Sequence, residues 1–216
     1  MIIVDQSAEI LSPLPDEGLL CLKAIEHAGR NCYASYDKVT DDSYKTFIAG
    51  LLKRGHETPI EFADMTVALT TSRAVLAEIT RHRLAAFCVE SQRYIQEAKT
   101  GDITFISPLW YDASEEDDNS AIWHSTMRMI EQSYKHQIDN GAKPQDAREV
   151  LPNSTACRIV MKANLREWRH IFDLRCSDAA YPPMRALMRN LLAQAHERIP
   201  VVFDDLYNKY NKEADA

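Results

Sequence analysis

Hydrophobic residues recur every three or four positions along much of the chain, which is the spacing of one face of an α-helix. The clearest stripe consists of Trp123, Met127, Ile130, Tyr134 and Ile138. It predicts a long amphipathic helix that ends at Gly141. Similar patterns, together with start and stop residues, predict helices over residues 17–28, 43–54, 73–84, 144–150, 164–174 and from about 183 to the residue before Pro200.

Capping residues mark several of these helix ends. Thr71 or Ser72 can accept a hydrogen bond from the first turn of the helix over 73–84, and Asn164 can do the same for its own helix. Gly55 stands where the second helix must stop, because glycine adopts the left-handed conformation at little cost.

Two short segments instead alternate with a period of two, as strands do. The segment Met65 to Thr70 is one, and Cys157, Ile159 and Met161 mark the other. Residues 87–106 have a mixed pattern and are expected to be extended, whereas the acidic run 112–119 has no apolar anchor and is expected to be a solvated loop. Since helices dominate and the strands do not alternate regularly with them, the pattern predicts an α+β fold. We find no linker and expect a single domain over residues 1–216.

The length and composition narrow the class of protein. A chain of 216 residues with 45% hydrophobic residues can bury the core of one ordinary domain. The net charge of -7 argues against nonspecific binding to nucleic acid or a membrane surface. No segment reaches the roughly 18 apolar residues of a membrane span, and the N-terminus does not have the pattern of a signal peptide. The five cysteines are odd in number and never form Cys-x-x-Cys, so we expect a reduced, cytoplasmic protein.

The densest group of chemically capable residues is Arg81-His82-Arg83, followed by Ser91 and Arg93. The guanidinium groups of two arginines can donate paired hydrogen bonds to phosphates and carbonyl oxygens. A serine beside an arginine in an extended segment can bind a phosphate. The first three residues also lie at the end of an expected helix, where surface cations are favourable without any ligand. Both interpretations remain open on these residues alone.

The other candidate residues favour structural roles when each is taken alone. The segment from His56 to Glu61 offers histidine and carboxylates, but no second histidine stands at ligand spacing, so we expect a polar turn and no metal site. Arg158 and Arg169 are expected to be surface charges, whereas Arg175 follows apolar residues and is expected to lie over the core. Cys88 could be a nucleophile beside cations, yet a buried thiol is the preferred interpretation.

The pattern Arg81-His82-Arg83, seven residues, Ser91 resembles the signature of the flavin-dependent thymidylate synthases, the ThyX family. Three further segments resemble that family in the same order: Gly55-His56-Glu57-Thr58-Pro59-Ile60-Glu61, Ala147-Arg148-Glu149-Val150-Leu151-Pro152, and Asn164-Leu165-Arg166 followed by Leu174-Arg175. Together they span residues 55–175, and an ordered set of four is hard to obtain by chance.

The resemblance implies a central mixed or antiparallel sheet flanked by helices in an FAD-bound homotetramer. It implies methylation of dUMP to dTMP, with methylenetetrahydrofolate as carbon donor and NADPH as reductant. The implied FAD contacts are His56, Thr58, Arg81, His82, Arg83, Asn164, Arg166 and His170. The implied dUMP contacts are Glu78, Arg81, Glu90, Ser91, Gln92, Arg93, Arg148 and Arg175. Arg175 is also the implied catalytic residue, against the uracil ring.

The chain departs from the family pattern around the nucleotide. Cys88 and Val89 stand where many members have Asn-Glu, and Glu78 replaces a common glutamine. Gln92 replaces a small residue, and His170 replaces an asparagine. These changes leave open a relative that hydroxymethylates a pyrimidine nucleotide. A nucleic-acid or nucleotide-binding module without chemistry is a further alternative, although the acidic balance counts against a nucleic-acid binder.

Overall fold

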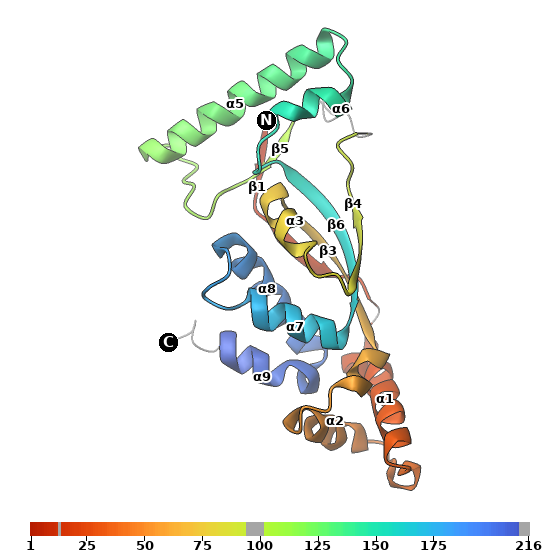
Figure 1. Ribbon diagram of the computed structural model, residues 1–216. Helices are drawn as coiled ribbons and strands as arrows, with labels where there is room; N and C mark the ends of the chain where they lie inside the picture. The colour runs from red at the N-terminus through yellow and green to blue at the C-terminus, as the bar shows by residue number, and fades with distance from the viewer. Residues whose placement is uncertain (13, 94–101, 212–216) are drawn as a thin grey trace. The chain divides into compact units, whose positions relative to one another are not determined.

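A computed structural model of the chain describes residues 1–12, 14–93 and 102–211 (Figure 1). The chain divides into two compact units, each assembled from several segments. Unit 1 contains residues 1–7, 69–81 and 88–159, and unit 2 contains residues 8–68, 82–87 and 160–216. The chain passes between the units several times, and the single domain over residues 1–216 stays a prediction. Among the described residues, no helix has the length and apolar character needed to cross a bilayer.

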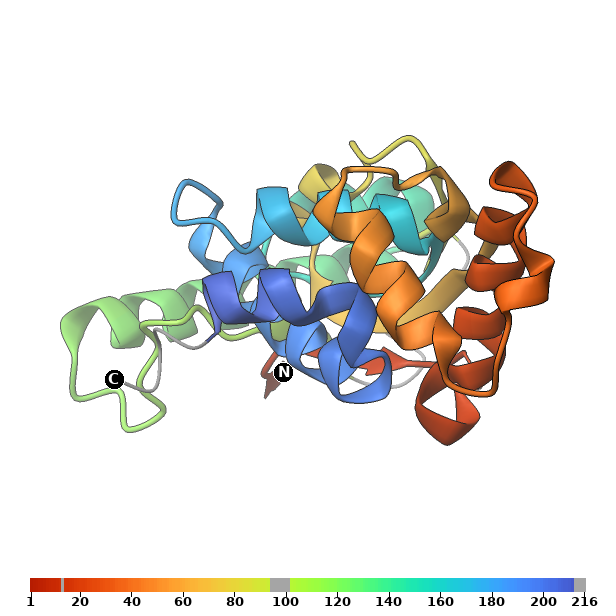
Figure 2. The same cartoon turned by 90° about the horizontal axis from the view of Figure 1, so that it is seen from below.

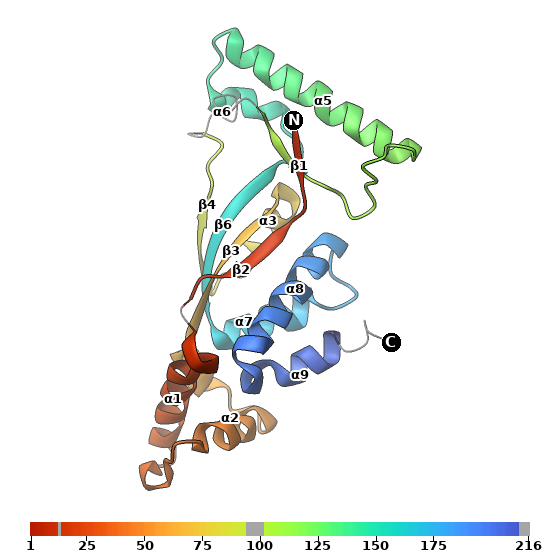
Figure 3. The same cartoon turned by 180° about the vertical axis from the view of Figure 1, so that it is seen from behind.

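The main sheet has four strands whose neighbours are distant in the sequence (Figure 3). Its order is β2-β3-β6-β4, with bounds β2 (Ser7–Ile10), β3 (Asp64–Ser72), β6 (Ala156–Asn164) and β4 (Ala85–Val89). A second, parallel pair joins β1 (Ile2–Val4) to β5 (Thr104–Ile106). This mixture of sheets and helices confirms the predicted α+β class.

Alternation explains why β3 forms where the sequence predicts it. Met65, Val67 and Leu69 are buried, while the residues between them are only partly covered. Successive side chains of a strand point to opposite faces, so this pattern buries one face of the sheet. β6 follows the same rule through Cys157, Ile159 and Met161, with exposed residues between them, and both predicted strands are confirmed.

Unit 1 is built around the long helix α5 (Asp118–Asp139), which begins with a hydrogen bond from the Ser120 amide to Asp117 Oδ2 (2.9 Å). Its predicted stripe is confirmed, since Met127 and Tyr134 are buried against Ile103 and Phe105. The shorter elements of this unit are α3 (Arg73–Ile79), α6 (Pro144–Ala147) and the 3-10 turn η3 (Arg148–Val150).

Unit 2 is mainly helical, and its C-terminal helices are the blue elements of Figure 2. Trp168, Phe172 and Phe203 are fully buried and pack in series, with ring centroids 5.6 Å apart in a tilted pair and 5.5 Å apart in an edge-to-face pair. The Trp168 indole also donates a 2.9 Å hydrogen bond to the Met65 carbonyl of β3. The elements of this unit are α1 (Pro15–Cys32), η1 (Tyr36–Lys38), α2 (Ser43–Lys53), η2 (Thr58–Phe62), α7 (Leu165–Arg175), α8 (Pro182–Arg198) and α9 (Pro200–Tyr210).

The expected caps are present. Ser72 Oγ accepts from the Val75 amide at 3.3 Å, and Asn164 Oδ1 accepts from the Glu167 amide at 2.8 Å. Gly55 and Gly141 have φ values of +70° and +89°, so both helices end through the left-handed conformation that glycine tolerates.

Some boundaries and short elements differ from the sequence predictions. The helix predicted over 73–84 ends at Ile79, where the Thr80 hydroxyl turns back to the Leu76 carbonyl at 2.9 Å. Pro200 begins α9 instead of only ending the preceding helix, because proline is well tolerated in a first turn. The short strands β1 and β2 were missed, and part of the segment expected to be extended, residues 94–101, lies outside the described residues.

We predict that Trp168→Phe destabilises the protein by about 2–3 kcal/mol, because it removes a buried hydrogen bond and leaves a cavity. Urea unfolding followed by circular dichroism measures the change. Trp110→Phe is the matched control, since Trp110 is 57% exposed and should change stability by less than about 0.5 kcal/mol. Equal effects of the two substitutions would contradict the anchoring role of Trp168.

Candidate functional site

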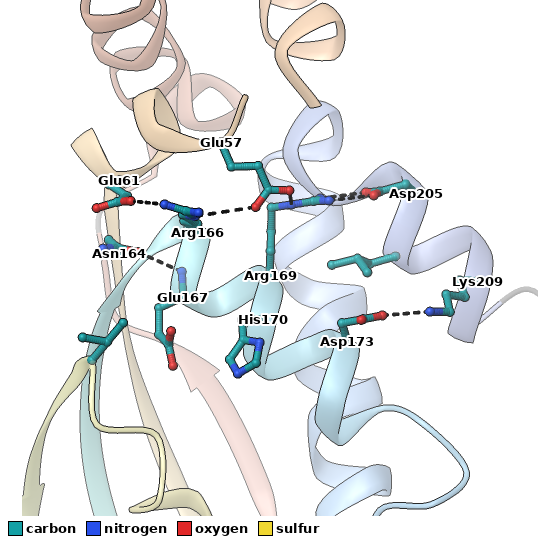
Figure 4. Close-up of a pocket in the computed structure, with 12 residues that line it drawn as sticks. Glu57, Glu61, Asn164, Arg166, Glu167, Arg169, His170, Asp173, Asp205 and Lys209 are labelled. Atoms are coloured by element: carbon teal, nitrogen blue, oxygen red, sulfur yellow. Dashed lines mark hydrogen bonds and ion pairs between the residues drawn. The ribbon is translucent and has the colours of Figure 1, made fainter. Parts of the chain in front are cut away.

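A charged cavity of about 820 Å³ lies within unit 2 along α7 (Figure 4). Its walls come from η2, α7, α9 and the turn before β4. Charged and polar side chains dominate the lining, which consists of Glu57, Glu61, Leu84, Asn164, Arg166, Glu167, Arg169, His170, Asp173, Asp205, Leu206 and Lys209. The cavity therefore suits a polar ligand better than an aliphatic one.

The spacing of residues along α7 explains why several of its side chains reach the cavity. Arg166 and His170 are four residues apart, and Glu167 and His170 are three apart, so they lie on one side of the helix. Trp168 and Phe172 lie on the buried side. One side of the helix is thus packed in the core, and another side lines the cavity.

Arg166 is held at the cavity by two acidic residues. Its guanidinium pairs with Glu61 and lies 3.8 Å from a Glu57 oxygen. The Arg166 side chain remains half exposed, so part of its donor fork faces the open space. The two carboxylates fix the direction of the guanidinium, while its remaining donors can meet a ligand.

Arg169 was expected to be a surface charge, and that expectation was wrong. The side chain is buried, makes two 2.7 Å hydrogen bonds to the Asp205 carboxylate and donates to the Val202 carbonyl. Burial alone would raise the pKa of Asp205, but the hydrogen bonds and charge of Arg169 outweigh it and hold that pKa below its usual range. Arg169 therefore ties α7 to α9.

A second group, which we call the His82 cluster, consists of His82, Glu167, His170 and Arg175. The Arg175 Nε donates to His82 Nε2 at 3.0 Å, and His82 Nδ1 lies 3.4 Å from Glu167 Oε1. The rings of His82 and His170 are 5.8 Å apart, edge to face. His82 is only 5% exposed. Burial first, and then the charges of Arg175 and His170, lower the pKa of His82 from 6.5 to about 4.

Three members of this cluster also have the composition of a metal site. Ligand atoms of His82, Glu167 and His170 all lie within 4.8 Å of one another. However, the Arg175 guanidinium already occupies one imidazole nitrogen, and its positive charge disfavours a second cation beside it. The absence of a metal site stays a prediction.

The structure brings together some of the residues expected to bind the cofactor. Asn164, Arg166 and His170 line the cavity, and His82 lies against Arg175. The remaining four are exposed and are not part of the cavity lining over the described residues: His56, Thr58, Arg81 and Arg83. His56 instead makes a 2.9 Å hydrogen bond with the Tyr33 hydroxyl.

Apart from Arg175, the residues expected to bind the nucleotide belong to unit 1. The Arg93 amide donates to Ser91 Oγ at 3.3 Å, which gives the segment after β4 a tight turn. Gln92 Nε2 is buried and has no hydrogen-bond partner among the described residues. An orphaned donor beside Ser91 is consistent with a ligand-binding turn. The other members of this group are Glu78, Arg81, Glu90 and Arg148.

The segment around β4 contains three residues singled out in the sequence. The Glu90 carboxylate accepts from the Arg158 amide at 3.2 Å, and its contact with the nucleotide stays a prediction. Arg158 is exposed, as expected of a surface charge. Cys88 was expected to be buried, but its side chain is exposed, because this position of β4 lies on the open face of the strand.

Sequence reasoning missed several cavity residues. Glu57 and Glu61 belong to the recognised segment after Gly55 and could have been found there. Glu167 is adjacent to Arg166 within another recognised segment. Asp205 and Lys209 had no usable signal, because the helix that carries them was not predicted.

We predict that His82 makes stability depend on pH. The native imidazole has a pKa of about 4 and the unfolded one about 6.5, so the stabilisation is fully present above pH 6.5 and is lost as pH falls toward 4. The loss should approach roughly 3 kcal/mol. Urea unfolding between pH 7 and pH 4 measures it, and His82→Gln should show a correspondingly flatter profile. Parallel profiles would contradict this environment for His82.

Comparison with known proteins identifies the family of the chain. The family described as "Thymidylate synthase complementing protein" matches residues 21–201. A flavin-dependent thymidylate synthase of Geobacter sulfurreducens is 31% identical over 189 residues, which cover 84% of this chain and 80% of the relative. A probable flavin-dependent thymidylate synthase of Mycobacterium phage D29 is 32% identical over 193 residues and covers 84% and 81% of the two chains.

Two crystal structures share the fold. A UMP/dUMP methylase, PolB, from Streptomyces cacaoi bound with 5-Br dUMP has a TM-score of 0.76 at 21% identity, over 97% of this chain and 98% of the other. Thymidylate Synthase X from Helicobacter pylori with FAD and dUMP has a TM-score of 0.74 at 20% identity, over 94% and 99%. From the family match and the sequence relatives together, the chain belongs to the flavin-dependent thymidylate synthases.

Proposed function

We propose that this chain converts dUMP to dTMP by reductive methylation, with bound FAD, methylenetetrahydrofolate as carbon donor and NADPH as reductant. The observation that carries the proposal is the common location of Asn164, Arg166 and His170. All three come from the C-terminal family segment, and all three line one cavity. A helix whose only role was to cover the core would not need to place these three polar side chains in the wall of one cavity.

The cavity residues fit a flavin nucleotide. A flavin ring offers carbonyl oxygens and ring nitrogens, and its diphosphate offers anionic oxygens, so the site needs hydrogen-bond donors with positive charge. Arg166 supplies a charged donor at the surface of the cavity, and His170 supplies a ring nitrogen. The nearby carboxylates of Glu57 and Glu61 are paired with Arg166, which limits their repulsion of a phosphate. When bound, the flavin supplies hydride transfer.

Arg175 is proposed to act on the uracil ring. A cation beside an acidic ring N–H lowers the pKa of that group and favours the ionised ring, which enriches the reacting carbon in electron density. The hydrogen bond to His82 restrains the guanidinium through its Nε. The task of these residues is positioning and electrostatic stabilisation.

Ser91 and Arg93 are proposed to bind the phosphate of dUMP. The turn that joins them and the buried Gln92 Nε2, which has no hydrogen-bond partner among the described residues, support this proposal. Further contacts to the nucleotide are assigned to Glu78, Arg81, Glu90 and Arg148, and further contacts to FAD to His56, Thr58, Arg81, His82 and Arg83. The relative from Helicobacter pylori contains FAD and dUMP, which supports both assignments by analogy.

The assembly and location are proposed on family grounds. We propose a homotetramer in the cytoplasm, with one domain per chain. The hydroxymethylating alternative uses the same flavin and nucleotide contacts but omits the final reduction. The identity of the product therefore separates the two reactions.

We predict that the purified protein binds FAD and forms dTMP from dUMP, methylenetetrahydrofolate and NADPH. Absorption spectroscopy measures bound flavin, and mass spectrometry identifies the nucleotide product. Omission of each component in turn is the control. Hydroxymethyl-dUMP as the end product would exclude the proposed reaction in favour of the hydroxymethylase, and a protein that takes up no flavin would exclude both.

We predict that Arg175→Ala lowers kcat about 10²–10³-fold while FAD remains bound, because the substitution removes an electrostatic contact that acts on the reacting ring. Single-turnover assays and flavin absorbance provide the two measurements. Arg198→Ala is the matched control, since Arg198 is an exposed arginine near the end of α8 outside the cavity lining. Undiminished turnover in Arg175→Ala would remove the catalytic assignment.

A further inference from the structure

The contact with Arg175 determines where neutral His82 carries its proton. An arginine Nε–H is always a donor, so His82 Nε2 must accept through its lone pair. A neutral imidazole with an accepting Nε2 has its hydrogen on Nδ1. The low pKa of His82 keeps the ring neutral near pH 7.

Glu167 stands on the other side of that ring. Its Oε1 lies 3.4 Å from His82 Nδ1, on the side of the imidazole that carries the hydrogen. Asn164 caps the helix through the backbone amide of Glu167, so the carboxylate is not used by the cap. Glu167 is 8% exposed, and a carboxylate at such a position requires partners that stabilise its charge.

We propose that Glu167 is a positioning residue that holds His82 in the Nδ1–H tautomer and, through His82, orients the guanidinium of Arg175. The row Glu167, His82, Arg175 connects a carboxylate in the first turn of α7 to the last residue of the same helix. The role for catalysis rests on the proposed function of Arg175, whereas the tautomer does not.

The row also explains how neutral His82 accepts a hydrogen bond from the cationic Arg175. If His82 carried its proton on Nε2, it would present a hydrogen to the Arg175 Nε–H and the contact would be lost. The Glu167 carboxylate favours the hydrogen on Nδ1, and its negative charge balances the guanidinium at the far end of the row. Since Arg175 donates to Nε2 and the Glu167 carboxylate faces Nδ1, His82 acts on a ligand mainly through Arg175.

The test compares Glu167→Gln with Glu167→Leu. The glutamine Oε1 can still accept from Nδ1–H, whereas leucine has no acceptor. Nitrogen-15 NMR of labelled imidazoles, with the His82 signals assigned by His82→Gln, identifies the tautomer. We expect the Nδ1–H form in the wild type and in Glu167→Gln, and a mixture of forms in Glu167→Leu. The Nε2–H form as the main wild-type species would overturn the proposal, whether or not the protein is an active synthase.

Kinetics test the connection to Arg175. We expect Glu167→Leu to lower kcat about 10–100-fold, the range typical of residues that orient a functional group from behind, with little change in the KM for dUMP or in bound FAD. Glu167→Gln should recover activity to within about threefold of the wild type. Glu197→Leu controls for the loss of a carboxylate, since Glu197 is exposed on α8.

Three outcomes would contradict the proposed positioning role of Glu167. Loss of FAD in Glu167→Leu would assign Glu167 to cofactor binding, and equal loss of kcat in the glutamine and leucine variants would show that the charge matters and the acceptor does not. Unchanged kcat in Glu167→Leu would remove the connection. If the wild type is inactive, the proposed synthase function fails, and the NMR measurement still decides the tautomer.

Discussion

The attachment of α7 to β3 is the constraint on which the candidate site depends. The indole of Trp168 is fully buried and donates to the Met65 carbonyl, and the Leu165 amide donates to the Ala63 carbonyl at 2.9 Å. Two hydrogen bonds to neighbouring points of the chain fix both the position and the rotation of the helix. Any rotation of α7 that exposed Trp168 would also turn Arg166 and His170 away from the cavity, because residues of one helix move together.

Two buried charged residues of α7, Arg169 and Glu167, each face a partner. Arg169 is neutralised by Asp205, which ties α9 to α7, and Glu167 is placed against His82. Burying such groups without partners would cost several kcal/mol each. Their pairing therefore restricts α7 to the arrangement in which both contacts are made. The cavity-lining face and the packed face of α7 are stabilised together, because they share one backbone.

An element could be predicted from the sequence when the interactions that form it join residues close together in the chain. Local patterns located β3, α5 and α7, since alternation, helical spacing and a capping residue such as Asn164 act within a few residues. α3 ends at Ile79, before Thr80, and α9 begins at Pro200, and a periodic hydrophobic pattern marks neither boundary. The pairing of Arg169 with Asp205 joins positions 36 residues apart, and no local signal distinguishes it from surface charge. The recognised segments supplied Arg166, His170 and Arg175, whereas the role of Glu167 required the geometry around His82.

Glu90, which follows the departures at Cys88 and Val89, has a structural role in unit 1. Glu90 lies in the segment where the chain strays from the family pattern, and a carboxylate there would repel a phosphate if it pointed toward one. Its Oε2 accepts from the Arg158 amide, while its own amide and carbonyl bond to the Arg158 carbonyl and to Arg73. Glu90 thus continues the connection between the end of β4 and β6, and its charge is directed toward the backbone of β6. The turn at Ser91 and Arg93 begins immediately after this anchor, so Glu90 also fixes where the proposed phosphate-binding turn starts.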